Sequence, residues 1–254
     1  MARTRSAPPV NNAIYDALDE RWYDAQDDPV ALLRAESGCR TPWVEETIRA
    51  QFGGKPARVL DIACGAGFLA NALASRGHVV TGVDASESSL AVAARHDATG
   101  KVRYAVGDAL RLPFDDASFD VACAMDFLEH VEDPRTVIAE AARILTPGGL
   151  FFFHTFNRNF LAWLVVIKGV EWFVKNTPRD LHVLRLFLKP SEVQAMCAAH
   201  GLRVRELRGV RPLLALAPLV RLLVTGRVPE DFRFRFTKST RISFTGVATK
   251  DEPS

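Results

Sequence analysis

A glycine-rich turn between a buried strand and a helix constrains the fold of this chain more than any other stretch. The apolar residues 59–62 predict the strand, and residues 68–76 carry apolar side chains at helical spacing. Gly65 and Gly67, in the turn between them, remove the side chains that would keep a ligand away from the backbone. A second apolar strand then ends at Asp84. This order of strand, glycine turn, helix, strand and acid predicts the nucleotide-binding half of a doubly wound α/β sheet.

Two kinds of ligand fit this turn, and one acidic residue distinguishes between them. Residues 65–70 satisfy the loose G-x-G-x-x-G/A pattern, so a dinucleotide and a Rossmann oxidoreductase are one interpretation. A carboxylate at Asp61, at the strand end, would repel a pyrophosphate seated on the same turn. It suits instead the ammonium and sulfonium groups of S-adenosylmethionine, whose ribose diol offers two donors to Asp84. The cofactor contacts predicted here are Asp61, Gly65, Gly67 and Asp84.

The length and composition of the chain limit the classes of protein to which it can belong. With 254 residues, 48% of them hydrophobic, the chain can form one domain with a sizeable core. The formal charge of +2 and the lack of a long basic tract argue against a nucleic-acid partner. Four widely spaced cysteines without a C-x-x-C pair favour reduced thiols in a cytoplasmic protein. The expected architecture is a single α/β domain, residues 1–254, with a doubly wound, mostly parallel sheet of seven strands. Its expected parts are a helical cap (1–52), a cofactor-binding core (53–155) and lid segments with the final strands (156–254).

A group of ionisable residues follows the predicted strand 121–125. Ligands of open α/β sheets lie at the carboxyl ends of the strands, so Asp126, Glu129 and His130 are candidate site residues. If residues 126–131 form a helical turn, these three side chains share one face. Two carboxylates and an imidazole there could bind a divalent ion, or His130 could act as a general base. The alternative is that Glu129 and His130 only cap and pair around the start of the next helix.

The segment before the glycine turn predicts a cap over the cofactor. Residues 12–23 place apolar side chains on one helical face, which suits either a cap or a helix packed on the domain. Two short helices are expected at 29–35 and 44–52. Arg40, between them, could reach the methionine carboxylate of the cofactor, whereas a lone arginine is commonly a solvated charge.

Two strongly apolar segments follow the predicted core. Residues 160–174 are apolar nearly all round, with Arg158, Lys168 and Lys175 at their flanks. This pattern suits a helix lying in a membrane interface, and a core helix is the competing interpretation. The expected membrane-facing residues are Phe160, Trp163, Leu164, Ile167 and Trp172. Residues 211–227 form a second apolar piece, broken by prolines, that would make a lid for an apolar substrate.

Five motifs taken together point to one family. They lie at residues 21–24, 60–67, 125–134, 155–159 and 187–192. With them the chain resembles the ubiquinone-biosynthesis O-methyltransferases, class I enzymes that use S-adenosylmethionine to methylate phenolic hydroxyls on polyprenylated catechol-type rings. The Thr-x-Asn-Arg-Asn stretch at 155–159 and the Phe-x-Lys-Pro stretch at 187–190 are specific to this family. The resemblance covers residues 15–250 approximately.

The resemblance implies an activity and a set of residue roles. The implied activity is O-methylation of a polyprenylated phenol or catechol in ubiquinone biosynthesis, with S-adenosylmethionine and Mg²⁺ or another divalent ion as cofactors. The implied cofactor contacts are Arg40, Gly65, Asp84, Asp108, Ala109 and Met125, of which Asp108 would read the adenine amino group. The implied metal ligands are Asp126, Glu129 and His130, with Glu129 and His130 also catalytic. The enzyme would lie on the cytoplasmic membrane face, where it could associate with other biosynthetic enzymes. A methyltransferase for another lipophilic phenol or secondary metabolite, and a non-catalytic lipid-binding module, are the alternatives.

Overall fold

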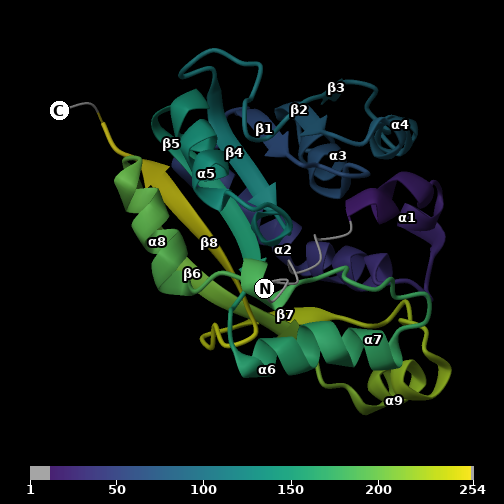
Figure 1. The fold of residues 1–254 in the computed structure, drawn as a ribbon. Helices are drawn as coiled ribbons and strands as arrows, with labels where there is room; N and C mark the ends of the chain where they lie inside the picture. The colour runs from purple at the N-terminus through teal and green to yellow at the C-terminus, as the bar shows by residue number, and fades with distance from the viewer. Residues whose placement is uncertain (1–11, 253–254) are drawn as a thin grey trace, which may run out of the picture.

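The glycine turn lies at the end of a central strand in a mixed sheet of eight strands (Figure 1). The computed structural model describes residues 12–252. In spatial order the strands are β3 (Arg103–Val106), β2 (Val79–Asp84), β1 (Arg58–Ile62), β4 (Phe119–Met125), β5 (Leu145–Phe156), β8 (Ser243–Lys250), β6 (Leu202–Pro212) and β7 (Phe234–Thr237). The strands β1 to β5 run parallel, whereas β8, β6 and β7 pair antiparallel. The doubly wound fold class is confirmed, and the short edge strand β7 is one more than the seven predicted.

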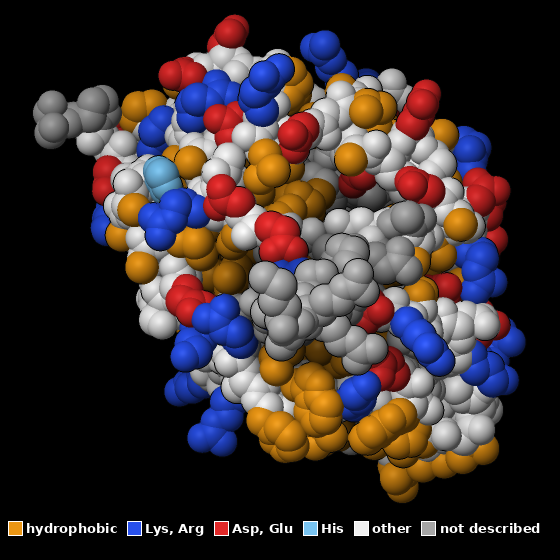
Figure 2. Space-filling view, viewed as in Figure 1, with side chains coloured by type: hydrophobic (Ala, Val, Ile, Leu, Met, Phe, Trp, Pro, Cys, Tyr) orange, Lys and Arg blue, Asp and Glu red, His pale blue; other side chains and the backbone are white. Residues whose placement is uncertain are grey.

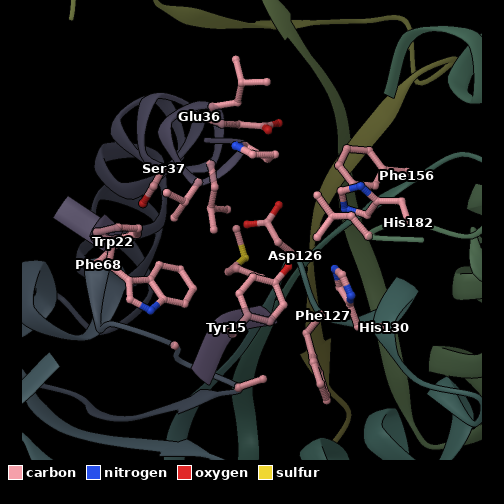
Figure 3. A pocket seen from close by; sticks show the side chains of 18 of the residues that line it. Tyr15, Trp22, Glu36, Ser37, Phe68, Asp126, Phe127, His130, Phe156 and His182 are labelled. Atoms are coloured by element: carbon pink, nitrogen blue, oxygen red, sulfur yellow. The ribbon is translucent and has the colours of Figure 1, made fainter. Parts of the chain in front are cut away.

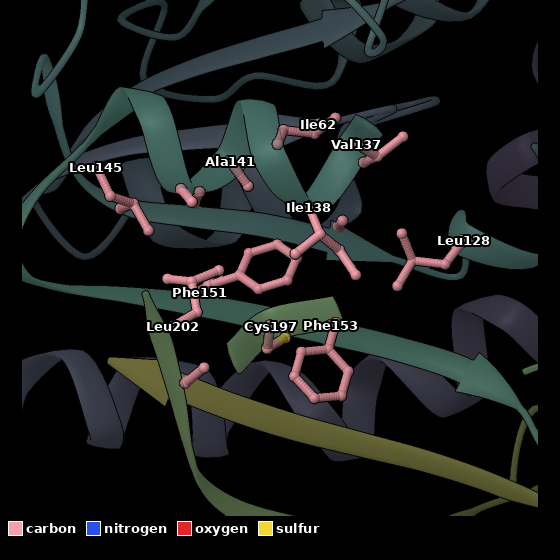
Figure 4. Packing of buried hydrophobic residues seen from close by; sticks show 14 of the residues in the cluster. Ile62, Leu128, Val137, Ile138, Ala141, Leu145, Phe151, Phe153, Cys197 and Leu202 are labelled. Atoms are coloured by element: carbon pink, nitrogen blue, oxygen red, sulfur yellow. The ribbon is translucent and has the colours of Figure 1, made fainter. Parts of the chain in front are cut away.

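Alternating side chains of the central strands build a core on each face of the sheet. The helices against the sheet are α2 (Val30–Gln51), α3 (Phe68–Ala74), α4 (Glu87–Arg95), α5 (Pro134–Ile144) and α8 (Pro190–Ala199). Phe151 and Phe153 of β5 lie on the face covered by α5 and α8, in one cluster with Ile138 (Figure 4). Phe152 points to the opposite face, where Trp43 of α2 packs edge-on with ring centroids 5.3 Å apart. Because both faces are covered, these strands are apolar along their whole length.

One long helix replaces the two short ones that the sequence predicts before β1. The helix α2 is continuous over 22 residues and includes Pro42, which cannot donate a helical hydrogen bond. Buried side chains on both sides of Pro42, from Ala31 to Ile48, outweigh this loss because packing rather than propensity stabilises most helices. Arg40 therefore projects from the middle of a helix and not from a loop.

The N-terminal segment forms two short helices where residues 12–23 predict one. A 3₁₀ segment, Asn12–Ala17, is separated from α1 (Arg21–Asp24) by Asp19, whose φ of 42° lies in the left-handed region. Tyr15 and Trp22, one from each piece, nevertheless stack with ring centroids 5.5 Å apart. Their shared apolar surface lies over the glycine turn, because a Cβ on Gly65 would come within 3.1 Å of the Trp22 ring.

The two apolar segments of the C-terminal half lie beside each other near β7 (Figure 1). They comprise α6 (Phe160–Ala162), a π-helical stretch (Trp163–Gly169), α7 (Val170–Phe173) and α9 (Leu216–Thr225). Val174 and Leu222 share a buried cluster with Ala31 of α2, so the two segments and α2 form one packed unit. We call α6 to α7 together with α9 the lid. Within residues 12–252, no helix has both the length and the apolar character needed to cross a bilayer.

Candidate active site

A cavity of about 1250 Å³ opens at the carboxyl ends of the parallel strands and continues beneath the lid (Figure 3). It begins at the point where strand order reverses between β1 and β4, the usual ligand position in a doubly wound sheet. Several residues predicted from the sequence line it. They are Arg40, Asp61, Gly65, Asp84, Asp108, Ala109, Met125, Asp126 and His130. The cavity thus joins a polar end at the glycine turn to an apolar end under α7 and α9.

Asp84 holds the glycine turn in shape. Its carboxylate accepts hydrogen bonds from the Gly65 N–H at 2.8 Å and from the Ser86 N–H at 2.9 Å. The carboxylate is thereby fixed at the cavity wall, and each oxygen keeps a lone pair for a further donor. A ribose diol suits this arrangement, since it supplies two adjacent hydroxyl donors.

Gly67 does not line the cavity, although the sequence places it among the cofactor contacts. Its φ of 77° starts α3, and a Cβ there would overlap the Tyr104 hydroxyl and approach Ala93. Gly67 is therefore required for the close packing of the turn against β3 and α4. Its contact with the cofactor stays a prediction beside this structural role.

The other predicted cofactor residues sit along the strand ends. Asp61 is buried at the end of β1, and this burial raises its pKa to about 7. Asp108 is exposed after β3, and one carboxylate oxygen accepts from the Leu110 N–H at 2.8 Å. Ala109 is buried beside it, and Met125 closes β4 at the cavity wall. These positions agree with the expected cofactor contacts, which remain predictions for each residue.

Arg40 forms a bidentate ion pair with Asp126 inside the protein. The two guanidinium nitrogens donate to the two carboxylate oxygens at 2.7 and 2.5 Å. The side chains are 3% and 14% exposed, respectively. Burial alone would raise the pKa of Asp126, but the Arg40 charge outweighs it and holds the pKa below its usual value. Arg40 is thus already paired with a protein carboxylate. If it also binds the methionine carboxylate of the cofactor, as predicted, its guanidinium would have to serve both carboxylates.

The structure does not group the donor atoms of Asp126, Glu129 and His130, the predicted metal ligands, in one cluster. Asp126 has a φ of 56°, and only the 3₁₀ turn Leu128–His130 follows it, so the i, i+3, i+4 helical geometry does not form. The carboxylate of Asp126 instead pairs with Arg40 of α2. Among the described residues the donor atoms instead form two clusters, each within 4.8 Å. The clusters are Glu36, Asp126 and His154, and Glu129, His130 and His182.

The first cluster already contains a cationic side chain. His154 Nε2 lies 3.2 Å from a Glu36 oxygen and 3.6 Å from an Asp126 oxygen, next to the Arg40 guanidinium. Burial raises the pKa of Glu36 to about 7 and lowers the pKa of His154 to about 3. Because Arg40 neutralises Asp126, this cluster does not suit a divalent ion.

The second cluster contains an unsatisfied buried carboxylate. Glu129 is fully buried, and neither of its oxygens has a hydrogen-bond partner among the described residues. Burial, followed by the charge of Asp126, raises its pKa to about 8. Buried polar atoms in proteins are nearly always paired, so two such oxygens behind the cavity-lining His130 indicate a missing partner.

The tautomer of His130 follows from its contacts with Asn12. The Asn12 amide nitrogen donates to the His130 carbonyl at 3.1 Å, and its side-chain oxygen lies 3.1 Å from His130 Nδ1. The proton of a neutral imidazole is therefore on Nδ1, and Nε2 keeps a free lone pair. Burial lowers the pKa of His130 to about 4, so the ring is neutral near pH 7. It can accept a proton or bind a cation.

The side chain of His182 lies beside His130 and comes from the segment that follows the lid helix α7. It follows α7 in the chain, and its ring centroid lies 5.2 Å from that of His130 and 5.0 Å from that of Phe156 (Figure 3). Burial lowers the pKa of His182 to about 3, so this imidazole is neutral as well. Sequence reasoning missed Glu36, His154 and His182, since none lies in a motif and their segments meet only in the folded chain.

Comparisons with known proteins define the class. The fold matches a possible histamine N-methyltransferase from Thermotoga maritima with a TM-score of 0.62, at 21% identity, over 94% of this chain and 99% of that one. It also matches magnesium protoporphyrin IX methyltransferase from Synechocystis with bound S-adenosylhomocysteine, with a TM-score of 0.59, at 18% identity, over 97% and 90% of the two chains. Residues 60–153 match the methyltransferase domain family. The fold is that of the class I methyltransferases.

Sequence relatives narrow the class to a family. Ubiquinone biosynthesis O-methyltransferases from Pseudomonas putida and Azotobacter vinelandii are each 39% identical over 202 residues, which cover 78% of this chain and 84% of the relative. The chain belongs to the ubiquinone biosynthesis O-methyltransferase family. It is an S-adenosylmethionine-dependent O-methyltransferase with a small-molecule substrate, and the oxidoreductase and non-catalytic alternatives are set aside.

Proposed function

We propose that this enzyme methylates a phenolic hydroxyl on a polyprenylated catechol-type ring in ubiquinone biosynthesis. One observation carries the proposal: a single cavity runs from the Asp84 carboxylate past the neutral His130 imidazole to an apolar end under the lid. The apolar end is lined by Val170, Phe173, Leu219, Leu222, Leu223 and Phe232. A polyprenylated substrate would fit this cavity with its ring beside His130 and its hydrocarbon chain in the apolar end under the lid. The names of the relatives support the same substrate class.

His130 is the residue that meets the phenolic hydroxyl in this proposal. A phenol with a pKa near ~10 is mostly protonated at neutral pH and must lose its proton to become a nucleophile. The free Nε2 lone pair of His130 serves that deprotonation, either by accepting the proton or by holding a cation beside the oxygen. S-adenosylmethionine supplies a methyl group on a sulfonium, and Asp84 with the glycine turn would orient it. The lid excludes water and aligns the reacting groups.

We also propose that a divalent ion is held at Glu129 and His130. The residues fit such an ion, because the two buried oxygens of Glu129 have no partner within residues 12–252 and His130 presents the ring nitrogen that Asn12 does not engage. A bound divalent ion lowers the pKa of a coordinated hydroxyl and fixes its position. Asp126, the third ligand expected from the sequence, is held by Arg40 instead.

A methyl-transfer assay tests the substrate class. Labelled methyl should pass from S-adenosylmethionine to a prenylated catechol at least about tenfold more efficiently than to the bare catechol, in kcat/KM. The reason is that each buried methylene contributes about 0.8 kcal/mol, and about 1.4 kcal/mol corresponds to a factor of ten. Equal efficiencies would favour a small phenol or secondary metabolite instead. Loss of transfer after chelation, restored by a divalent ion, would assign His130 to the ion, whereas full activity would make it the base.

We propose further that the lid brings the enzyme to the membrane on its cytoplasmic face. Its outer surface carries apolar side chains that are more than 60% exposed, at the lower edge of Figure 2. They are Phe160, Trp172, Leu214, Leu216 and Val224. Exposed apolar patches of this kind are typical of membrane or protein contacts. A polyprenylated substrate stays in the bilayer, so the enzyme has to approach the ring there.

Only some of the residues that the sequence predicts to face the membrane are exposed in the structure. Of the five residues expected to face lipid, Phe160 and Trp172 are exposed, but Ile167 is buried, with Trp163 and Leu164 half-buried. Their neighbours Val166 and Phe187 form a small core beneath the lid. Two of the three flanking cations are paired within the protein, Arg158 with Glu192 and Lys168 with Glu171. Apolar burial, more than attraction to anionic lipids, would therefore provide the affinity.

Liposome sedimentation tests the membrane proposal. The double variant Trp172→Glu, Leu216→Glu should lose most sedimentation with polar-lipid liposomes while its melting temperature stays within a few degrees of wild type. Both side chains are largely exposed, at 63% and 77%, so neither substitution buries a charge. The matched control is Val79→Glu, an apolar residue 64% exposed at the start of β2, away from the carboxyl ends of the strands. Wild-type protein that does not sediment with liposomes at low salt would refute the proposal.

A further inference from the structure

The second donor cluster combines two parts of the chain that are far apart in sequence. Glu129 and His130 belong to the 3₁₀ turn after β4, and His182 belongs to the segment that follows α7. One ligand atom from each lies within 4.8 Å of the others. A transition-metal ion about 2.0–2.2 Å from each ligand spans ligand pairs up to about 4.4 Å apart. The cluster therefore needs to contract by a few tenths of an ångström at most to hold one ion.

The unpartnered carboxylate of Glu129 is an independent sign that a cation belongs there. Glu129 is 0% exposed, and both oxygens lack hydrogen-bond partners among residues 12–252. In the other donor cluster the ring nitrogens of His154 also lack hydrogen bonds, but the carboxylate of Asp126 is already paired with the Arg40 guanidinium. Of the two clusters among the described residues, the one with His182 is the one whose carboxylate is not paired with an arginine.

The surroundings orient both imidazoles for binding. His130 directs Nδ1 to Asn12, which leaves Nε2 as the ligand atom, the arrangement that a supporting hydrogen bond commonly gives a metal-binding histidine. His182 is held between the rings of Phe156 and Phe187, with centroid distances of 5.0 and 6.1 Å. Two nitrogen donors and one carboxylate are a ligand set typical of zinc-class ions rather than of Mg²⁺, which prefers oxygen. Both histidines line the cavity, so an ion bound to them would be open to a further ligand from that side.

We propose that His182 is the third protein ligand of a zinc-class ion, together with Glu129 and His130. The inference rests on the ion-bound form of the proposed function and names the ligand that sequence reasoning did not find. Since His182 lies in the segment after α7, nine residues beyond Phe173, the ion would link this segment to the carboxyl end of β4. The bound ion would in this way connect the segment that follows the lid helix α7 to the sheet.

Cobalt titration of the metal-free full-length protein tests this ligand assignment. Co²⁺ is a spectroscopic probe of zinc-class sites, and wild type should bind one equivalent with visible absorption bands. His182→Ala should bind at least about tenfold more weakly and shift those bands, because one nitrogen ligand is lost. The matched control is His200→Ala, at the C-cap of α8, which should bind as wild type does. Hydrogen exchange of residues 176–186 should slow on metal binding in wild type and in the control, but not in His182→Ala.

Each result has a definite meaning. Unchanged cobalt affinity and spectrum in His182→Ala would overturn the assignment of His182 while leaving the ion at Glu129 and His130 intact. Absence of binding to wild type would overturn the metal site altogether, and methyl transfer by the metal-free enzyme would then still support the proposed activity. Melting of the metal-free proteins serves as the folding check. If His182→Ala does not fold, His182→Gln, which keeps the bulk of the side chain, takes its place in the titration.

Discussion

Replacing Arg40 by alanine is expected to destabilise the fold by about 3–5 kcal/mol at pH 7, the range for breaking a buried ion pair from one side. The substitution removes both hydrogen bonds to Asp126 and leaves that carboxylate unpaired, with its side chain only 14% exposed. The free energy of unfolding in urea measures the effect. The matched control is Arg58→Ala, which breaks a bidentate pair with Asp120 that is 49% and 22% exposed. That change should cost about 1 kcal/mol or less.

The pH dependence of the Arg40→Ala effect identifies its cause. In wild type the folded-state pKa of Asp126 is lowered, so its stabilising contribution is present above the unfolded pKa and lost as pH falls through the folded value. In the variant, burial without Arg40 would raise the folded pKa, so the charged carboxylate destabilises the fold above the unfolded pKa. Lowering the pH from 7 toward 4 protonates it and should narrow the gap between the two proteins. A gap that stays constant would mean that lost packing, and not the unpaired charge, dominates.

Replacing His130 by alanine is expected to reduce methyl transfer by about 10²–10⁴, the usual contribution of a positioned acid or base. The loss is expected whether His130 accepts the phenolic proton or holds the ion, because Nε2 is required in both cases. Binding of S-adenosylhomocysteine, measured by calorimetry, should change little, since the variant leaves the Asp84 side of the cavity intact. A variant with more than about a tenth of wild-type activity would remove His130 from the reaction.

The pH profile of the wild-type enzyme provides a second check on His130. Burial lowers its pKa to about 4, and the neutral imidazole is the form that can act. The rate should therefore show no inflection near pH 6.5, the ordinary value for histidine. His200→Ala, outside the cavity, is the control for the general effect of losing a histidine and should retain full activity.

The predicted residues that the structure places at the cavity wall are mostly encoded within one short stretch. The glycine turn, with Gly65 and Asp84, is one strand–turn–helix–strand unit, so its geometry follows from local spacing. The carboxyl end of β4 was also found from the chain order alone. The family resemblance rested on the same local motifs and is confirmed by the relatives.

The parts that the sequence missed depend on contacts between distant segments. His182, His154 and Glu36 come from a loop, a strand and a helix with no motif, and only the fold brings them to the end of β4. The helical turn assumed at Asp126 does not form, because this residue has a left-handed φ of 56° and only a short 3₁₀ turn follows it. Ile167 was assigned to the surface because an apolar stretch without a clear period does not show which side faces the protein.

The uninterrupted course of α2 has a mechanical consequence. Ala31, which packs in the cluster that joins α7 and α9, lies nine residues before Arg40, about 13.5 Å along the helix axis at 1.5 Å per residue. A helix transmits displacement along its axis, so this stretch of α2 behaves as a lever between the lid and the Arg40–Asp126 pair. Two separate helices with a loop between them would absorb such movement. A substrate chain that fills the apolar end of the cavity could therefore displace the Arg40–Asp126 ion pair through α2, without contacting either residue.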